Sequence, residues 1–581
     1  MFVNGAESLI VNGGEGADDL DVDLSGAPNV HNTIEYTPGD TVNSGHIQVD
    51  DLIPISFVNL GGEGGGQITD IRTVTFIDDV GFDTLVYNGT DGADRFIVDD
   101  NAIRLTSPIG EHELVQVGGE GGIEALVMKG LGSDDTFVIG GNVFTGAEGG
   151  GITVEGGQPD SGSDTVIYGA EGDVTVDLVN NTIDDADTFV TPDGTLIGIE
   201  DAIVEAFGTW NVTVLGGSDD DMVDVTPLGA NSVQTQLQGS GTLFEFNGIV
   251  DFDVDLLGGN DQMNVYGTPN ADMITLSQGM VDLTSPDREA VNYANVEDLA
   301  ILGLGGDDQL TADFDDGDIE PAVFFDGGVG LDALWLVGGE GASTVYTVGP
   351  EEETGRIEHG ESVVEFADLE PIVDLTAGTL TVNATNGSNA INYIEGPNSG
   401  TAAVNDVATA LVSVDGFETI EFANKTTLII NGLAGDDTIN LNNPATVTGL
   451  TDIVVNSGDP TASDTLIVNG SPFDDSIVID QLVIGGGRVV GAQPVTVTYT
   501  GTEHLEVNGQ AGADTIELIT PAGRDQVQVF PGVTGTAGAI TVHNPDTSEM
   551  LLELGFENID TSAGITIDDV SGERTDDQIG R

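Results

Sequence analysis

Aspartate recurs at one position of this sequence, directly after a glycine-rich turn and two residues before an apolar residue. Calcium takes about six to eight hard oxygen ligands, and a glycine-rich turn can add its carbonyl groups to an aspartate carboxylate. The position therefore predicts calcium-binding turns. Asp19 joins the set because it stands beside Asp18, and a cation relieves the repulsion between adjacent carboxylates. The predicted ligands are Asp18, Asp19, Asp94, Asp135, Asp221, Asp261, Asp272, Asp308, Asp437, Asp475 and Asp514.

The same aspartates have a simpler explanation, in which each carboxylate caps its own turn and no metal is bound. Adjacent acids such as Asp436-Asp437 favour the cation. A second acid, found at Glu124, Glu297 and Glu503, stands further in sequence from the glycine-rich turns. We expect these glutamates to accept a hydrogen bond from a neighbouring backbone amide at a strand edge, and not to bind metal.

Catalytic motifs are not evident. The six histidines are scattered, without a His-Glu-x-x-His pair, and no glycine-rich loop stands beside a Lys-Ser/Thr pair. We therefore predict no enzyme and name no catalytic residue. An elongated β-helix that acts on polysaccharide through paired carboxylates, or binds carbohydrate, is the alternative.

Strands must position these turns. Short runs with alternating apolar residues precede each turn, and the apolar residues on its two sides differ by 11 in number, as in Leu85/Phe96 and Leu466/Ile477. Several turns begin with Asn-Gly, as at Asn88-Gly89, which predicts positive φ there. No helical periodicity is evident. A six-residue turn cannot join parallel neighbours, so the two strands either form a loose hairpin or lie on opposite sides of a roll and pair with later copies. We favour the roll, because it brings the Gly and Asp of successive copies into register.

A longer unit surrounds this motif, and the sequence is predicted to be all-β, with tandem β-solenoid or β-roll modules and Gly/Asp-rich turns. Leu105-Thr106-Ser107-Pro108 returns as Leu283-Thr284-Ser285-Pro286, which indicates internal duplication. The predicted divisions are a partial first repeat (1–82), repeats at 83–163, 164–260 and 261–331, a repeat with an insertion (332–463), a repeat at 464–524 and a degenerate terminal repeat (525–581).

Segments such as Gly303-Leu304-Gly305-Gly306-Asp307-Asp308-Gln309-Leu310 resemble the hemolysin-type (RTX) calcium-binding repeats, in a divergent and interrupted form. The resemblance implies a parallel β-roll in which turn carbonyls and aspartates of successive turns hold calcium. It also implies a ligand role for a subset of the aspartates, Asp18, Asp94, Asp135, Asp308, Asp437, Asp475 and Asp514. Family members run their nonapeptides without interruption, whereas tens of residues separate the copies here.

Composition limits the partners. With 101 acidic residues against 11 basic ones, the formal net charge is -90, which disfavours nucleic acid and anionic membrane and favours divalent cations. A salt-adapted acidic surface without specific metal sites explains the same charge. Cysteine is absent, so no disulfide holds the fold. No apolar run suggests membrane insertion.

These features predict an extracellular, calcium-binding structural protein of a surface filament, surface layer or adhesin. The terminal residues match incomplete repeats. Residues 5–9 correspond to the part of the long unit that contains the recurrent glutamate, and not to the start of that unit. Residues 561–564 replace an expected acidic turn. We therefore expect head-to-tail self-association or continuation into neighbouring segments of a longer chain. Surface polysaccharide is a further candidate partner.

Overall fold

The structure, a computed structural model, is built from β-strands. It describes residues 8–14, 18–24, 32–60, 73–77, 82–99, 102–112, 114–116, 123–140, 150–157, 163–185, 194–239, 241–285, 287–339, 341–397, 407–459, 463–521, 525–560, 564–569 and 578–580. These residues form 52 strands and no helix, so they also contain no helix that could cross a membrane. The predicted all-β class is confirmed. Residues 5–7 and 561–563, which the expectation about the chain ends involves, lie outside the described part.

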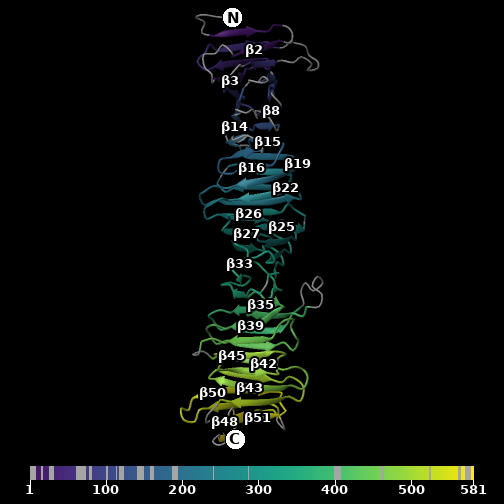
Figure 1. Cartoon of the computed structure of the whole chain (residues 1–581), viewed down its shortest axis with the longest axis vertical. Helices are drawn as coiled ribbons and strands as arrows, with labels where there is room; N and C mark the ends of the chain where they lie inside the picture. The colour runs from purple at the N-terminus through teal and green to yellow at the C-terminus, as the bar shows by residue number, and fades with distance from the viewer. Residues whose placement is uncertain are drawn as a thin grey trace. The chain divides into compact units, whose positions relative to one another are not determined.

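The chain divides into two compact units, whose strands are labelled in Figure 1. The first comprises Met1–Tyr266 with Asp287–Asp298, and the second comprises Gly267–Pro286 with Leu299–Arg581. In each unit the strands form two stacks, in which hydrogen-bonded neighbours come mostly from successive coils of the chain. Most of these pairings are parallel, which is the arrangement of a β-solenoid.

The first unit contains stacks A and B, which share the long strands β19 and β22. In order of pairing, stack A consists of β2 (Asp19–Asp23), β6 (Thr73–Ile77), β11 (Leu114–Gln116), β9 (Ala102–Ser107), β8 (Arg95–Asp99), β13 (Thr136–Ile139), β15 (Thr165–Ala170), β19 (Asp201–Leu215), β22 (Leu243–Asp255), β21 (Ser232–Leu237), β20 (Met222–Gly229) and β23 (Gln262–Tyr266), with β10 (Gly110–Glu111) beside β9. Stack B consists of β1 (Leu9–Asn12), β5 (Ile55–Val58), β4 (Ser44–Val49), β3 (Thr33–Pro38), β7 (Thr84–Asn88), β12 (Ala125–Leu131), β14 (Gly151–Gly157), β18 (Gly194–Ile197), β17 (Thr182–Asp184), β16 (Val174–Asp177), the second halves of β19 and β22, and β26 (Val291–Ala294).

The second unit contains stacks C and D. Stack C consists of β27 (Asp298–Leu302), β29 (Ala322–Asp326), β33 (Ser362–Ala367), β32 (Gly355–His359), β31 (Thr344–Val348), β35 (Gly378–Asn383), β39 (Lys425–Asn431), β41 (Asp452–Asn456), β45 (Thr496–Thr500), β44 (Gly486–Val490), β43 (Ser476–Val483), β47 (Thr515–Thr520) and β51 (Ile565–Asp569). Stack D consists of β24 (Met273–Ser277), β28 (Gln309–Asp313), β30 (Ala333–Val337), β34 (Ile372–Asp374), β38 (Ile420–Phe422), β37 (Ala410–Val414), β36 (Ala390–Glu395), β40 (Thr438–Asn442), β42 (Thr465–Asn469), β46 (His504–Asn508), β50 (Met550–Glu557), β49 (Gly538–His543), β48 (Gln526–Pro531) and β52 (Gln578–Gly580), with β25 (Met280–Ser285) beside β24.

The two strands that flank a glycine-rich turn lie in different stacks, as the sequence predicts. Strand β7 pairs in parallel with β12, where Leu85 stands opposite Leu126, and β8 pairs with β13, where Phe96 stands opposite Phe137. The apolar residues of each strand are buried between the stacks. Across this core the rings of Tyr87 and Phe96 meet edge to face at 5.5 Å. Each coil therefore presents its glycine-rich turn directly above the turn of the next coil.

The sequence did not predict the antiparallel strands. Strand β44, for example, pairs with β43 on one side and with β45 on the other, antiparallel to both. Such a strand separates two runs of parallel strands within the same stack: one run ends on one side of it, and another begins on the other side. The excursions between repeats contain these reversals.

Candidate metal-binding turns

The first glycine of each turn is a point of close approach between successive coils. The amide of Gly509 donates to the carbonyl of Glu557 in the next coil at 3.0 Å. A Cβ atom at Gly509 would lie 2.6 Å from the carbonyl oxygen of Asn558 and 2.5 Å from Oδ2 of Asp514. Only glycine therefore fits.

Several of the Asn-Gly turns contain the expected positive φ, but not at the glycine of the Asn-Gly pair. Gly89, Gly432, Gly470 and Gly509 all lie outside the left-handed region, and their lack of a side chain is used for space. In several turns it is the following residue that has positive φ, such as Leu433 at 76°.

Carboxylates and backbone amides form a ladder in several segments along the turns. In the second unit the amide of Asp272 donates to Oδ1 of Asp308 at 2.7 Å, and the amide of Asp308 donates to Oδ1 of Asp332 at 2.6 Å. Equivalent bonds run from Asp94 to Asp135, Asp135 to Asp164, Asp221 to Asp261, Asn389 to Asp437, Asp437 to Asp464, and Asp475 to Asp514. One carboxylate per coil thus replaces a backbone partner, and we call this series the carboxylate ladder.

Glutamate ends several segments of the carboxylate ladder. Oε2 of Glu297 accepts the amide of Asp261 at 2.8 Å, and Oε2 of Glu503 accepts the amide of Asp464 at 3.0 Å. Glu124 accepts the amide of Asp83 in the same way. The prediction that these glutamates bond neighbouring backbone amides is confirmed.

A second row of carboxylates lies outside the first. Oδ1 of Asp436 accepts the amide of Ser463 at 3.1 Å, while the amide of Asp437 donates to Asp464 at 2.8 Å. Two consecutive residues of one coil thus exchange two hydrogen bonds with two consecutive residues of the next. The same reciprocal pair joins 220–221 to 260–261, 307–308 to 331–332 and 474–475 to 513–514. Adjacent acids therefore have a structural role that needs no cation.

The second carboxylate oxygen divides the turns into two kinds. In the first kind Oδ2 accepts an amide from its own turn: Thr268 donates to Asp272 at 2.6 Å and Ser471 donates to Asp475 at 2.7 Å. Asp94 and Asp221 are bonded likewise. For these four predicted ligands the simpler explanation, a carboxylate that caps its own turn, describes the structure.

In the second kind of turn Oδ2 is buried and has no hydrogen-bond partner among the described residues. The residue four positions earlier has positive φ in these turns, as at Leu304, where φ is 73° before Asp308, except in the turn of Asp464, where that residue lies outside the described part. Such buried oxygens belong to Asp18, Asp135, Asp261, Asp308, Asp332, Asp437, Asp464 and Asp514. The next coil comes close to the first glycine of the turn, and one of its carbonyl oxygens lies near this Oδ2. At Gly509, for example, the carbonyl oxygen of Asn558 and Oδ2 of Asp514 both lie beside the glycine.

Burial makes Asp135, Asp308 and Asp437 hard to ionise. Desolvation is the main cause that raises the pKa of Asp135 and Asp308 to about 7 and that of Asp437 to about 6. Neighbouring aspartates of the ladder raise the pKa further, and the amide hydrogen bonds lower it in part. When such an aspartate is ionised, its buried Oδ2 has no hydrogen-bond donor beside it. A bound proton or a bound cation supplies the missing positive charge.

Among the predicted ligands, Asp18, Asp135, Asp261, Asp308, Asp437 and Asp514 share the buried Oδ2 without a hydrogen-bond partner. Asp19 differs, because its exposed side chain lies on strand β2 and not in a turn. Asp332 and Asp464 were not predicted as ligands, since the sequence shows them as the first residues of a longer unit. For Asp332 the glycines at 327, 328 and 330 were the available signal, whereas Asp464 follows only Gly458.

The donor set partly fits calcium. It consists of hard oxygens, a carboxylate and a carbonyl, and it contains no nitrogen or sulfur. No group of three or more His, Cys, Asp or Glu side chains converges on one point within the residues that the structure describes. A cation here would therefore depend on turn carbonyls and water for its other ligands.

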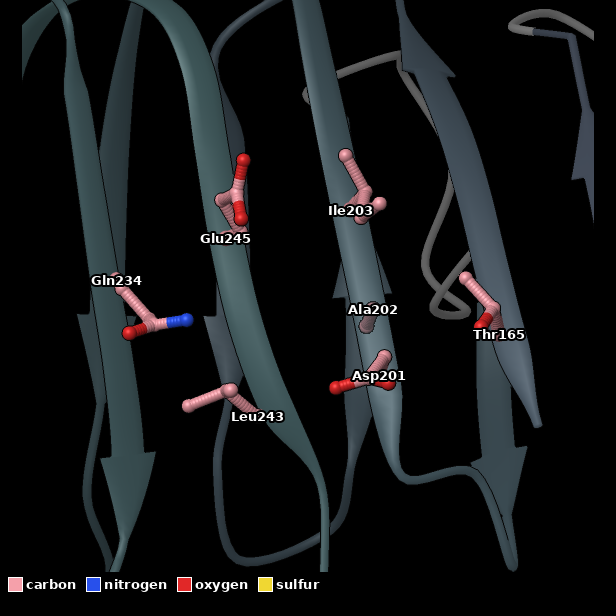
Figure 2. A pocket seen from close by; sticks show the side chains of 7 residues that line it. All are labelled: Thr165, Asp201, Ala202, Ile203, Gln234, Leu243 and Glu245. Atoms are coloured by element: carbon pink, nitrogen blue, oxygen red, sulfur yellow. The ribbon is translucent and has the colours of Figure 1, made fainter. Parts of the chain in front are cut away.

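A shallow groove of about 280 Å³ lies elsewhere, across four neighbouring strands of stack A (Figure 2). Asp201 on β19 and Glu245 on β22 both project into it, with Gln234 and Thr165 at its sides. The two acids are diagonal neighbours, because Glu245 stands opposite Ile203 in the register. The seven described side chains that line it include no aromatic ring.

Neither the protein-family models nor the curated proteins contain a match to this chain.

Proposed function

We propose that this protein is an extracellular structural protein, a component of a surface filament, surface layer or adhesin, whose solenoid is stabilised by calcium at turns of the second kind. One observation carries the proposal: buried aspartate oxygens without a donor recur at the same turn position in successive coils. A repeat architecture in which each coil contacts its neighbours suits a scaffold role.

Charge and donor chemistry favour a hard divalent cation. The net charge of -90 concentrates cations around the chain, and the absence of cysteine leaves oxygen as the ligand. Calcium accepts irregular sets of carboxylate, carbonyl and water, whereas magnesium requires near-octahedral geometry. A site with one carboxylate is weak, which suits the roughly 10⁻⁴–10⁻³ M affinities of extracellular calcium modules.

Thermal unfolding with calcium and with chelator, at pH 7.5 and matched ionic strength, tests the proposal. A combined Asp135→Asn, Asp308→Asn and Asp437→Asn variant keeps the oxygen that accepts the ladder amide and places an NH₂ group beside the carbonyl. We expect calcium to raise the Tm of the wild type and to raise that of the variant much less. Bound ligand stabilises the folded state by mass action.

Asp272→Asn is the matched control. Both oxygens of Asp272 accept hydrogen bonds from Thr268. The NH₂ group of the asparagine replaces one of these accepting oxygens, so the variant should have a lower Tm, by the same amount with and without calcium. If sodium chloride reproduces the calcium effect, or the triple variant keeps it in full, the acidic surface and not the turns responds to cations.

A further inference from the structure

A lysine and an aspartate form a fully buried ion pair in the second unit. Nζ of Lys425, at the start of β39, lies 2.8 Å from Oδ2 of Asp374, at the end of β34, and neither side chain is exposed to solvent. The two residues come from successive coils and from stacks C and D. Lys425 is one of only two lysines, with Lys129.

The surroundings of the pair are apolar on the side of the core. Asp374 stands in register with Leu336 of β30 and Phe422 of β38, and both are completely buried. Removing two charges from water costs several kcal/mol per ion, and their attraction seldom more than offsets that cost. A pair of charges at this place thus calls for a chemical reason.

Hydroxyl groups connect the two charges. Nζ of Lys425 donates to Oγ1 of Thr376 at 2.6 Å, and that hydroxyl donates to Oδ1 of Asp374 at 2.7 Å. Nζ also donates to Oγ1 of Thr344 at 3.0 Å, and Thr344 lies 3.0 Å from Nδ1 of His359. A proton can therefore move from the amine toward either the carboxylate or the imidazole without a water molecule.

We propose that Lys425 and Asp374 form an intramolecular amide bond in the folded protein. Nζ attacks Cγ of Asp374, the Nζ–Cγ bond forms and the Cγ–Oδ1 bond breaks. One ammonium proton passes through Thr344 to His359, and a second passes through Thr376 to Oδ1. The proton on His359 then returns through the hydroxyls of Thr344 and Thr376, which lie 3.3 Å apart, so Oδ1 leaves as water. Ammonium and carboxylate thus become one neutral amide and one water, with no other reactant.

Burial favours each step. Desolvation lowers the pKa of Lys425, against the opposing effect of Asp374, so the neutral amine is accessible. Desolvation also lowers the pKa of His359, which keeps the imidazole neutral and able to accept a proton. The fold holds the two reacting groups in contact, so the reaction does not incur the entropy cost of a bimolecular encounter. The neutral amide suits the apolar core better than two charges.

Such a bond would tie one coil covalently to the next. The chain contains no cysteine, so a disulfide cannot do this. The inference is independent of calcium binding.

Intact-mass measurement of the full chain under denaturing conditions tests the proposal. We expect a mass lower than the sequence mass by one water molecule, and a branched proteolytic peptide that joins Lys425 to Asp374. The ion pair of Lys129 and Glu155, which is 2.9 Å long but partly exposed, is the internal control and should yield no branched peptide. A wild-type chain at its full sequence mass, without the branched peptide, would overturn the proposal and leave an ion pair only.

Variants identify the groups that react. Lys425→Arg should remove the mass loss, and Asp374→Asn should change it to the loss of one ammonia. Thr376→Val keeps the shape but not the hydroxyl, and should slow bond formation at least about tenfold, as loss of a proton-transfer group does. If Thr376→Val forms the bond at the wild-type rate, Thr376 takes no part in proton transfer. The wild-type mass decides the main question even where a variant fails to fold.

Discussion

The backbone amide of Asp308 donates a 2.6 Å hydrogen bond to the carboxylate of Asp332, which lies 24 residues later and one coil further along the second unit. The carboxylate of Asp307 accepts the amide of Leu331 in return, at 3.1 Å. Side chains thus continue the hydrogen bonding of the parallel strands through the turns. This explains why acids occur in pairs there.

Removal of one of these acceptors should destabilise the solenoid. Asp332→Ala leaves the buried amide of Asp308 without a partner, which costs about 1–3 kcal/mol. Asp332→Asn keeps the accepting oxygen and should cost less. Hydrogen exchange at the amide of Asp308 measures the effect locally, which suits a repeat protein that does not unfold in two states. Equal protection in the wild type and the alanine variant would contradict the role of the ladder.

The first glycine of a turn should not tolerate alanine. A Cβ at Gly303 would lie 2.6 Å from the carbonyl of Gly327 and still closer to Oδ2 of Asp308. We expect Gly303→Ala to destabilise by about 1–3 kcal/mol through overpacking. Gly258→Ala is the control, because a Cβ there meets nothing within 4 Å. Equal Tm values for the two variants would exclude close approach as the reason for the glycine.

Calcium stoichiometry should depend on the aspartates of the second kind of turn and not on the glutamates. Asp437→Asn should lower the number of calcium ions bound at saturation, since its free oxygen is removed. Glu297→Gln should leave that number unchanged, because Oε2 of Glu297 already accepts the amide of Asp261. Equilibrium dialysis with calcium measures both. A loss of calcium in the glutamate variant alone would reverse the two roles.

The repeat pattern was sufficient to predict the all-β solenoid and the placement of paired strands in different stacks. The offset between Leu85 and Phe96 implied two facing strands, and their register with Leu126 and Phe137 confirms this. Sequence spacing succeeds here because a two-residue period and a fixed turn length leave few alternatives.

The rest depended on contacts between coils that sequence spacing does not reveal. Asp332 was taken as the start of a unit, and only the structure shows it beside Asp308. Asn-Gly at Asn431-Gly432 has the composition of a tight hairpin turn, but Gly432 is needed for the space beside Ser457. The antiparallel strands β9 and β25 carry the duplicated Leu-Thr-Ser segments, but sequence spacing alone does not show that they turn back onto β8 and β24.

Stability without calcium should fall as pH rises. The folded-state pKa of Asp135 and Asp308 is raised from 3.8 to about 7, mainly by desolvation, so the folded state keeps protons that the unfolded state releases. Where the folded state binds more protons, the free energy of unfolding decreases with pH, here between about 4 and 7. In chelator we therefore expect a lower Tm at pH 8 than at pH 5. Calcium should reduce that difference, because it binds the deprotonated carboxylate.

The general repulsion of the acidic surface acts in the same direction, and the asparagine variant separates the two effects. Asp135→Asn, Asp308→Asn and Asp437→Asn together remove three buried titrating groups but leave most of the surface charge. In chelator and high salt, the Tm of this variant should change less between pH 5 and pH 8 than that of the wild type, since salt screens the exposed charges and not the buried ones. Parallel pH profiles for the two proteins would show that the buried carboxylates do not control stability.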